Sequence, residues 1–261
     1  MSEAYVKHNT TDGICTIEFF HPQSNSLPGA VLNQLAETIT AAGKEEQVLA
    51  ILLKSGGDRA FCAGASFDEL IAIENEAAGK EFFSGFAKVI NAMRTCPKFI
   101  IGRVQGKTVG GGVGVASSMD YCFATQYASI KLSELAVGIG PFVVGPAVER
   151  KVGKAAFNAL AIDATGWRDA EWAKQQGMYS EVFESVEDMD EAIGAFLEKV
   201  KTFNPEAMAE MKRIFWRGTE DWDTLLMERA ATSGKLVLSD FTRNAINKFK
   251  SKSEPHSSNE A

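Results

Sequence analysis

Two apolar segments, each followed by a glycine-containing turn, constrain the fold of this chain most. Residues 48–53 have the sequence VLAILL and residues 99–104 have FIIGRV, so both faces of each segment are largely apolar. Strands of this kind are buried on both sides, as in a parallel sheet that is covered by helices. A helix is expected between them at residues 79–95, and another before them, where Val31, Leu35 and Ile39 are spaced by four. The sequence therefore predicts an α/β fold.

The ends of the chain differ in character. The first part predicts a hairpin, with strands at residues 5–8 and 14–20 around a turn that ends at Gly13. Later strands are expected at 121–124, 129–132 and 179–183, and amphipathic helices are expected at 186–201, 205–217, 220–232 and 235–249.

These patterns predict three regions. We expect an α/β body at residues 1–184, a helical region at 185–250 and a disordered polar tail at 251–261. The apolar faces of the helical region must pack on the body or on a neighbouring subunit, so self-association is expected.

Charge and hydropathy exclude several classes of partner. The chain has 261 residues, with 27 Lys and Arg against 34 Asp and Glu, and it contains no basic block. Binding to nucleic acid is therefore not expected, because neutralising phosphates requires clustered cations. No apolar run approaches the roughly 20 residues that span a bilayer, and the first residues lack the apolar core of a signal peptide. We expect a cytoplasmic protein that does not bind membranes.

The cysteines and histidines give little support to metal or Ser-His-Asp chemistry. The cysteines form no C-x-x-C pair, and we expect them to be reduced and partly buried. They are Cys15, Cys62, Cys96 and Cys122. The histidines are at positions 8, 21 and 256, and the first and last lie near the ends of the chain. A metal site with histidine ligands or a Ser-His-Asp relay would therefore depend on His21 alone. No metal site is predicted.

Two glycine-containing turns could bind a ligand through their backbone. Residues 61–66 and residues 110–112 each follow a strand and precede a helical pattern. A single turn of this kind more commonly serves only close packing. Two that face one point would instead present unpaired N–H groups at helix N-termini and form an oxyanion hole, which can stabilise an enolate.

Several motifs in order resemble the crotonase, or enoyl-CoA hydratase/isomerase, superfamily over nearly the whole folded chain. The motifs are Asn25-Ser26-Leu27, residues 59–65, residues 104–106 leading into 110–112, Ala116, Asp120, residues 132–138 and residues 153–156. The resemblance implies a spiral of ββα units with a C-terminal helical trimerisation region, assembled as a homotrimer or a dimer of trimers. It also implies an acyl-CoA thioester as substrate and no cofactor, because coenzyme A is part of the substrate.

The resemblance also implies roles for individual residues. The amides of Ala65 and Gly111 would form the oxyanion hole. Glu134 matches the second glutamate of the family's hydratases, whereas Gly114 occupies the position of the first. A carboxyl in an apolar pocket would have a raised pKa, which suits a proton shuttle.

Loss of one carboxylate favours isomerisation. Moving a double bond from C3 to C2 needs one proton carrier, whereas hydration needs a carboxylate for water and help from a second. We expect 3-enoyl-CoA to 2-enoyl-CoA isomerisation first and 2-enoyl-CoA hydration second, with Asp68 or Glu69 as the other acid. Acyl-CoA hydrolysis, decarboxylation or CoA binding without turnover are further alternatives on the same fold.

Residues in or beside the first turn, and residues after Glu134 that would shape an acyl tunnel, are expected to contact the substrate. Candidates for substrate or CoA binding are Ala63, Ser66, Phe67, Asp68, Pro141 and Phe142, of which Phe142 could equally be a core residue. The CoA phosphates could be held by Lys54, Lys98, Lys248 or Lys250, among which the sequence does not choose. His21 and Ser133 are expected to have only local hydrogen-bonding roles.

Overall fold

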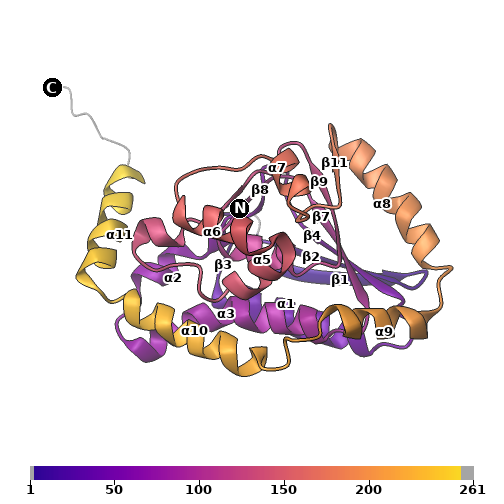
Figure 1. The fold of residues 1–261 in the computed structure, drawn as a ribbon, viewed down its shortest axis with the longest axis horizontal. Coiled ribbons are helices and arrows are strands. Elements are labelled where there is room, and N and C mark those ends of the chain that lie inside the picture. Colours follow the sequence, from indigo (N-terminus) through magenta and orange to yellow (C-terminus); the bar gives the residue numbers. More distant parts are fainter. Residues whose placement is uncertain (1–2, 254–261) are drawn as a thin grey trace.

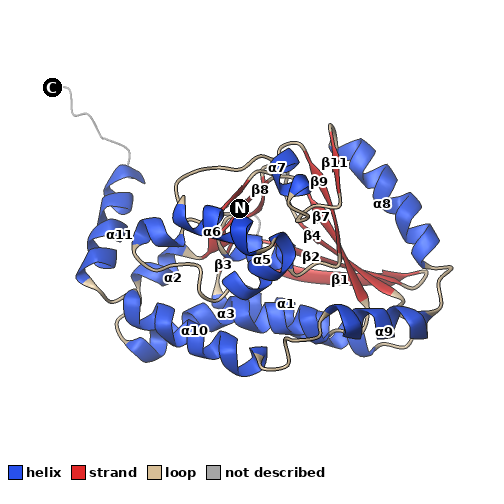
Figure 2. Ribbon diagram, in the orientation of Figure 1, coloured by secondary structure: helices blue, strands red, loops and turns tan. Residues whose placement is uncertain are grey.

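The main sheet of the computed structural model, which describes residues 3–253, has six strands in the order β1-β2-β4-β7-β9-β11 (Figures 1 and 2). Its strands are β1 (Tyr5–Thr11), β2 (Ile14–Phe20), β4 (Ala50–Ser55), β7 (Phe99–Val104), β9 (Tyr121–Thr125) and β11 (Glu181–Phe183). The expected hairpin is present as the antiparallel pair β1–β2, and the other pairs are parallel.

A second layer of short strands follows the main strands. It contains a three-stranded sheet, β10-β8-β5, and a two-stranded sheet, β3-β6. Their bounds are β3 (Ser26–Leu27), β5 (Ala60–Cys62), β6 (Gly64–Ala65), β8 (Lys107–Val109) and β10 (Ile130–Lys131). Each of β2, β4, β7 and β9 therefore continues into a short strand of this layer.

A helix follows β3, β6, β8 and β10, which completes the ββα repeat. The helices are α1 (Gly29–Lys44) after β3, α2 (Phe67–Ile71) and α3 (Glu76–Thr95) after β6, α4 (Gly111–Ser117) after β8 and the 3-10 helix η1 (Glu134–Val137) after β10. This confirms the predicted spiral. The start of each helix consequently lies at the end of the second layer, where the two glycine turns and Glu134 are found.

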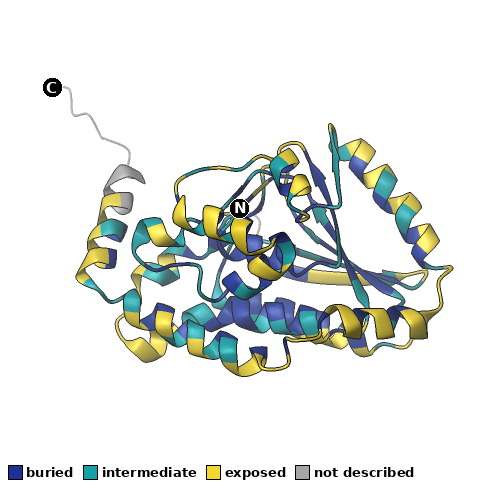
Figure 3. Ribbon diagram, in the orientation of Figure 1, coloured by how far each residue is buried: buried dark blue, intermediate teal, exposed yellow. Residues whose placement is uncertain are grey.

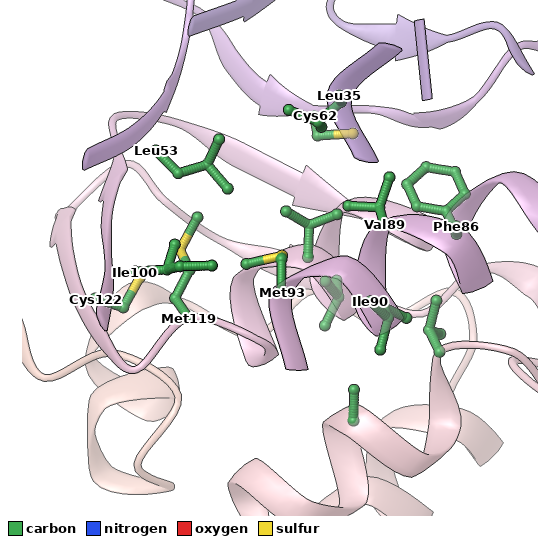
Figure 4. Close-up of a cluster of buried hydrophobic side chains, with 14 of the residues drawn as sticks. Leu35, Leu53, Cys62, Phe86, Val89, Ile90, Met93, Ile100, Met119 and Cys122 are labelled. Atoms are coloured by element: carbon green, nitrogen blue, oxygen red, sulfur yellow. The ribbon is translucent and has the colours of Figure 1, made fainter. Parts of the chain in front are cut away.

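Helices cover both faces of the main sheet (Figures 1 and 3). In β4, Ile51 and Leu53 belong to the large core beneath α1 and α3, part of which is shown in Figure 4. Ala50 belongs to a second core, to which α8 (Val186–Val200) and α9 (Pro205–Phe215) contribute. The β4 strand is thus buried on both sides, as its apolar sequence predicts.

The C-terminal helices differ from the prediction in their bounds. The expected break between 220–232 and 235–249 is wrong, because α10 (Trp222–Leu236) continues through Gly234 and is followed by α11 (Asp240–Ser253). A Cβ atom added to Gly79 of α3 would lie 2.7 Å from Cα of Gly234, so this glycine allows two helices to touch. The helices α5 (Gly145–Val152), α6 (Lys154–Ile162) and α7 (Ala170–Gln175) complete the fold.

Other sequence predictions have mixed outcomes. The four cysteines are free, as expected, and all are buried. The predicted tail at 251–261 begins inside α11, and residues 254–261 lie outside the described residues. Within residues 3–253 no helix has both the length and the apolar character needed to cross a membrane. The three-region division stays a prediction, although α8, α9 and α10 pack on the body of their own chain.

A buried ion pair attaches α9 to the main sheet. Lys212 is 1% exposed, and its Nζ lies 2.5 Å from Oδ2 of Asp120. The same carboxylate oxygen accepts a hydrogen bond of 2.7 Å from the backbone N–H of Ile100, at the second residue of β7. This explains the position of Asp120 within the family-like motifs: it joins the turn before β9, strand β7 and a helix 92 residues away.

We expect Lys212→Met to lower the free energy of unfolding by about 3 kcal/mol, because it leaves Asp120 buried without its cation. Urea denaturation measures this change. Arg213→Met is the matched control on the same helix, since Arg213 and Glu210 form an exposed pair whose loss should cost less than about 1 kcal/mol. Equal losses in the two variants would contradict the assignment of Lys212 as the anchor.

Candidate active site

The three predicted catalytic residues, Ala65, Gly111 and Glu134, line one cavity of about 240 Å³. They come from three successive ββα units, because Ala65 ends β6, Gly111 begins α4 and Glu134 begins η1. Among the described residues that line the cavity, Glu134 is the only ionisable one. The remainder of the wall is mainly apolar, so the cavity suits a hydrocarbon chain with one reactive polar end.

The two glycine turns face each other. A Cβ atom added to Gly64 would lie 3.8 Å from the backbone nitrogen of Gly111 and 3.3 Å from the carbonyl oxygen of Val109. Because Gly111 is the first residue of α4, its N–H has no acceptor within the helix. The structure therefore brings the turn of Gly64 and Ala65 close to the Gly111 N–H at the start of α4. The use of the Ala65 and Gly111 amides as an oxyanion hole stays a prediction.

Asparagine and serine from the β2–β3 connection fix the first turn. Asn25 is buried, and its amide nitrogen donates hydrogen bonds of 2.9 Å to the carbonyl oxygens of Gly56 and Ala60. The Ser26 hydroxyl donates a bond of 2.8 Å to the carbonyl oxygen of Ala65. The family-like segment at residues 25–27 thus has a structural role, which is to hold the backbone around Ala65.

The second turn is fixed to the segment that precedes Glu134. The N–H of Gly110 donates a 2.9 Å hydrogen bond to the carbonyl oxygen of Lys131, in β10. Gly110 has a φ of +52°, and a Cβ atom added there would lie 3.1 Å from Oε1 of Glu134. Glycine at this position therefore permits both the turn and the close approach of the carboxyl group.

The Glu134 carboxyl group is in an environment that disfavours its charge. Its Oε2 atom is buried and has no hydrogen-bond partner among the described residues. Burial raises the pKa of Glu134 from 4.5 to about 7, although a contact with its own backbone opposes this rise. Near neutral pH the group is thus able both to accept and to donate a proton.

Aromatic residues of α3 form a wall that the sequence analysis did not identify. Phe82, Phe83 and Phe86 line the cavity, and a side chain at Gly111 would overlap the ring of Phe86. Their spacing matches one face of the expected helix at 79–95, but periodicity shows only that a face is buried and not what it contacts. Phe86 is labelled in Figure 4.

The predicted substrate-binding residues divide into two groups. Four of them line the cavity, namely Ala63, Phe67, Pro141 and Phe142. The carbonyl oxygen of Phe142 accepts a hydrogen bond of 3.5 Å from Nη1 of Arg229.

Ser66 and Asp68 do not line the cavity. The Ser66 side chain caps α2 by accepting a bond from the Glu69 N–H, and exposed Asp68 accepts a 3.1 Å hydrogen bond from Gln23. Their contacts with CoA stay predictions.

Lys54, one of the lysine candidates for CoA binding, and His21 have contacts within the chain. Lys54 pairs with Glu18 at 2.9 Å, so it is already engaged, while the side chain of Lys250 lies outside the described part. His21 Nδ1 accepts a local hydrogen bond from the N–H of Gln23. Within residues 3–253 no group of three or more His, Cys, Asp or Glu residues could hold a metal ion.

Comparisons with known proteins agree with this architecture. The family model described as enoyl-CoA hydratase/isomerase matches residues 9–258. A probable enoyl-CoA hydratase from Rhizobium meliloti is 31% identical over 207 residues, which cover 77% of each chain. A peroxisomal Delta(3,5)-Delta(2,4)-dienoyl-CoA isomerase from Arabidopsis thaliana is 24% identical, over 96% of this chain and 94% of its own.

Solved structures share the fold. The crystal structure of an enoyl-CoA hydratase from Bacillus halodurans has a TM-score of 0.86 at 19% identity, with 94% of this chain and 99% of that chain covered. At this level of identity the likeness establishes the fold, while the match of the family model over nearly the whole chain establishes the family. The chain belongs to the enoyl-CoA hydratase/isomerase family of the crotonase superfamily.

Proposed function

We propose that this protein converts 3-enoyl-CoA into 2-enoyl-CoA, with Glu134 as the proton shuttle. The observation that supports this most is the single ionisable side chain on the described cavity wall, with a pKa of about 7. An isomerase removes one proton from C2 and returns one proton to C4, so a single carboxyl group suffices.

The proposed reaction proceeds in two proton transfers. Carboxylate Glu134 takes the proton from C2, and the C–H electron pair forms a dienolate whose charge reaches the thioester oxygen. The amides of Ala65 and Gly111 hold this oxygen. Protonated Glu134 then gives the proton to C4, the double bond lies between C2 and C3, and the carboxylate is restored without any net consumption of water.

Hydration of 2-enoyl-CoA is the second candidate, because the relative from Rhizobium meliloti is a probable enoyl-CoA hydratase. It needs a second group to manage the water molecule, and Asp68 or Glu69 could supply a carboxylate. Neither residue lines the cavity: Asp68 is exposed, and Oε2 of Glu69 accepts a 2.9 Å hydrogen bond from the N–H of Gly29. Their placement favours isomerisation.

Further parts of the proposal concern the state of the enzyme. We propose that it uses no cofactor apart from the CoA of its substrate, and that it assembles as a homotrimer or a dimer of trimers. A cytoplasmic location stays a prediction. An acyl-CoA hydrolase or a CoA-binding protein without turnover would have no need of a shuttle that returns a proton to the substrate.

Glu134→Gln should lower kcat/KM for 3-enoyl-CoA isomerisation by about 10²-fold or more, because the amide cannot accept the C2 proton. Growth of the conjugated-thioester absorbance measures the reaction, and loss of that absorbance from 2-enoyl-CoA measures hydration in parallel. Glu171→Gln, at an exposed glutamate that does not line the cavity, serves as the control and should change the rate less than twofold. Full activity in the Glu134→Gln enzyme would exclude the proposed role.

The pH profile of kcat/KM should follow the raised pKa of Glu134. The carboxyl group is neutral below its pKa and cannot act as a base, so the rate should rise through pH 7 and reach a plateau above it. The ordinary pKa of a glutamate would instead give a plateau above about pH 5. Stopped-flow isomerisation between pH 5 and pH 9 distinguishes the two profiles, and the residual activity of Glu134→Gln should lack this step.

A further inference from the structure

The buried residue Gly114 of α4 has no room for a side chain. A Cβ atom added to it would lie 2.6 Å from Cγ1 and 2.8 Å from Cβ of Val144, and 3.4 Å from Cδ1 of Ile90. Both neighbours are hydrocarbon side chains, and they are 3% and 0% exposed. Contacts of 2.6 Å are far shorter than the ordinary packing distance between carbon atoms. The space beside Gly114 is therefore filled from other elements.

This filled space adjoins the oxyanion turn. Gly114 lies three residues after Gly111, so the two share one face of α4, and a side chain on a helix is directed toward its N-terminus. A side chain at residue 114 would therefore extend toward the Gly111 amide. Val144, which immediately precedes α5, occupies that region and also lines the cavity.

The aromatic wall and the filled space share one helix. Ile90 lies one turn after Phe86 on α3, and Phe86 packs against Gly111 (Figure 4). The α3 helix consequently supplies the wall at Gly111 and part of the packing at Gly114. No polar atom is among the three nearest atoms to the position that a Cβ of residue 114 would take.

We propose that Val144 is a specificity-determining residue that prevents hydration by occupying the place of an attacking water molecule. The inference rests on the proposed function of Glu134. In hydration, the water oxygen bonds to C3, the electron pair of the double bond moves to form the enolate, Glu134 protonates C2, and the water must lose a proton to an acceptor. The methyl groups of Val144 can neither hold this water nor accept its proton.

The predicted consequence is a ratio of two activities. Wild-type enzyme should isomerise 3-enoyl-CoA at least about 10²-fold faster than it hydrates 2-enoyl-CoA. A factor of this size is the usual loss of rate when one general acid or base is missing from an active site. Damage to the fold would lower both rates together. A change in specificity instead raises hydration while isomerisation stays equal or falls.

Two variants test the role of Val144. Val144→Ser removes one branch of the side chain and places a hydroxyl group that can hold water on the other, and it should raise hydration at least about tenfold. Val144→Gly combined with Gly114→Glu removes both atoms of residue 144 that would meet a side chain at residue 114 and supplies a carboxylate, and it should raise hydration by about 10²-fold. Val152→Ser is the control: it makes the same change at the other end of α5, at a buried residue that does not line the cavity.

The outcomes separate this inference from the proposed function. If wild-type enzyme isomerises but folded Val144→Ser hydrates no faster than wild type, the role of Val144 is wrong and the isomerase proposal stands. If wild-type enzyme does not isomerise but either Val144 variant gains hydration, the isomerase proposal fails and the role of Val144 stands. Hydration by wild-type enzyme as fast as isomerisation would overturn the inference directly. Val144→Ser decides the matter if the double variant does not fold.

Discussion

The short strands of the second layer hold the site together. Hydrogen bonds of 2.9 Å join the Gly110 N–H to the Lys131 carbonyl and the Thr108 N–H to the Ser129 carbonyl, so the turn before α4 and the segment before Glu134 move as one unit. Gly64 brings the Ala65 turn against the same unit at Val109. The Gly111 N–H, the Ala65 turn and the Glu134 carboxyl group are therefore held in fixed relative positions, which is the condition under which fixed dipoles stabilise developing charge most effectively.

Local patterns in the sequence predicted much of this arrangement. Residues 48–53 indicated a strand buried on both faces, and the two glycine turns indicated a possible backbone site, because each signal lies within a few residues. Glu134 was assigned to the same site through the family resemblance and not through a local pattern. Contacts between distant segments were not predictable. Gly234 looked like a helix break, but it lies inside α10 against Gly79, and Asp120 meets a partner 92 residues away. Similarly, the sequence predicted a helix at 79–95 without revealing that Phe82 and Phe86 of this helix line the cavity.

Two buried carboxyl groups illustrate opposite uses of the interior. Asp120 has a cation at 2.5 Å and a backbone donor at 2.7 Å, and this satisfied acid connects elements. No cation pairs with Glu134 among the described residues, and burial raises its pKa to about 7. A carboxyl group whose pKa is raised in the folded state contributes fully to stability only at pH values below the pKa that it has in the unfolded chain. This contribution to the free energy of unfolding is lost as the pH rises through 7. The proposed proton shuttle thus costs stability at the pH where it would work, and the large apolar core offsets that cost.

The choice between two reactions of the thioester depends, in this mechanism, on packing as well as on catalytic groups. The α4 helix supplies the Gly111 donor at its first residue and the crowded position of Gly114 one turn later. Because Val144 fills the latter position from a different ββα unit, the chain could acquire a carboxylate there only if the second segment changed too. A single Gly114→Glu replacement would meet Val144 before it met substrate. Evolution between isomerase and hydratase chemistry on this scaffold would therefore require coupled changes at residues 114 and 144, with the oxyanion turns left as they are.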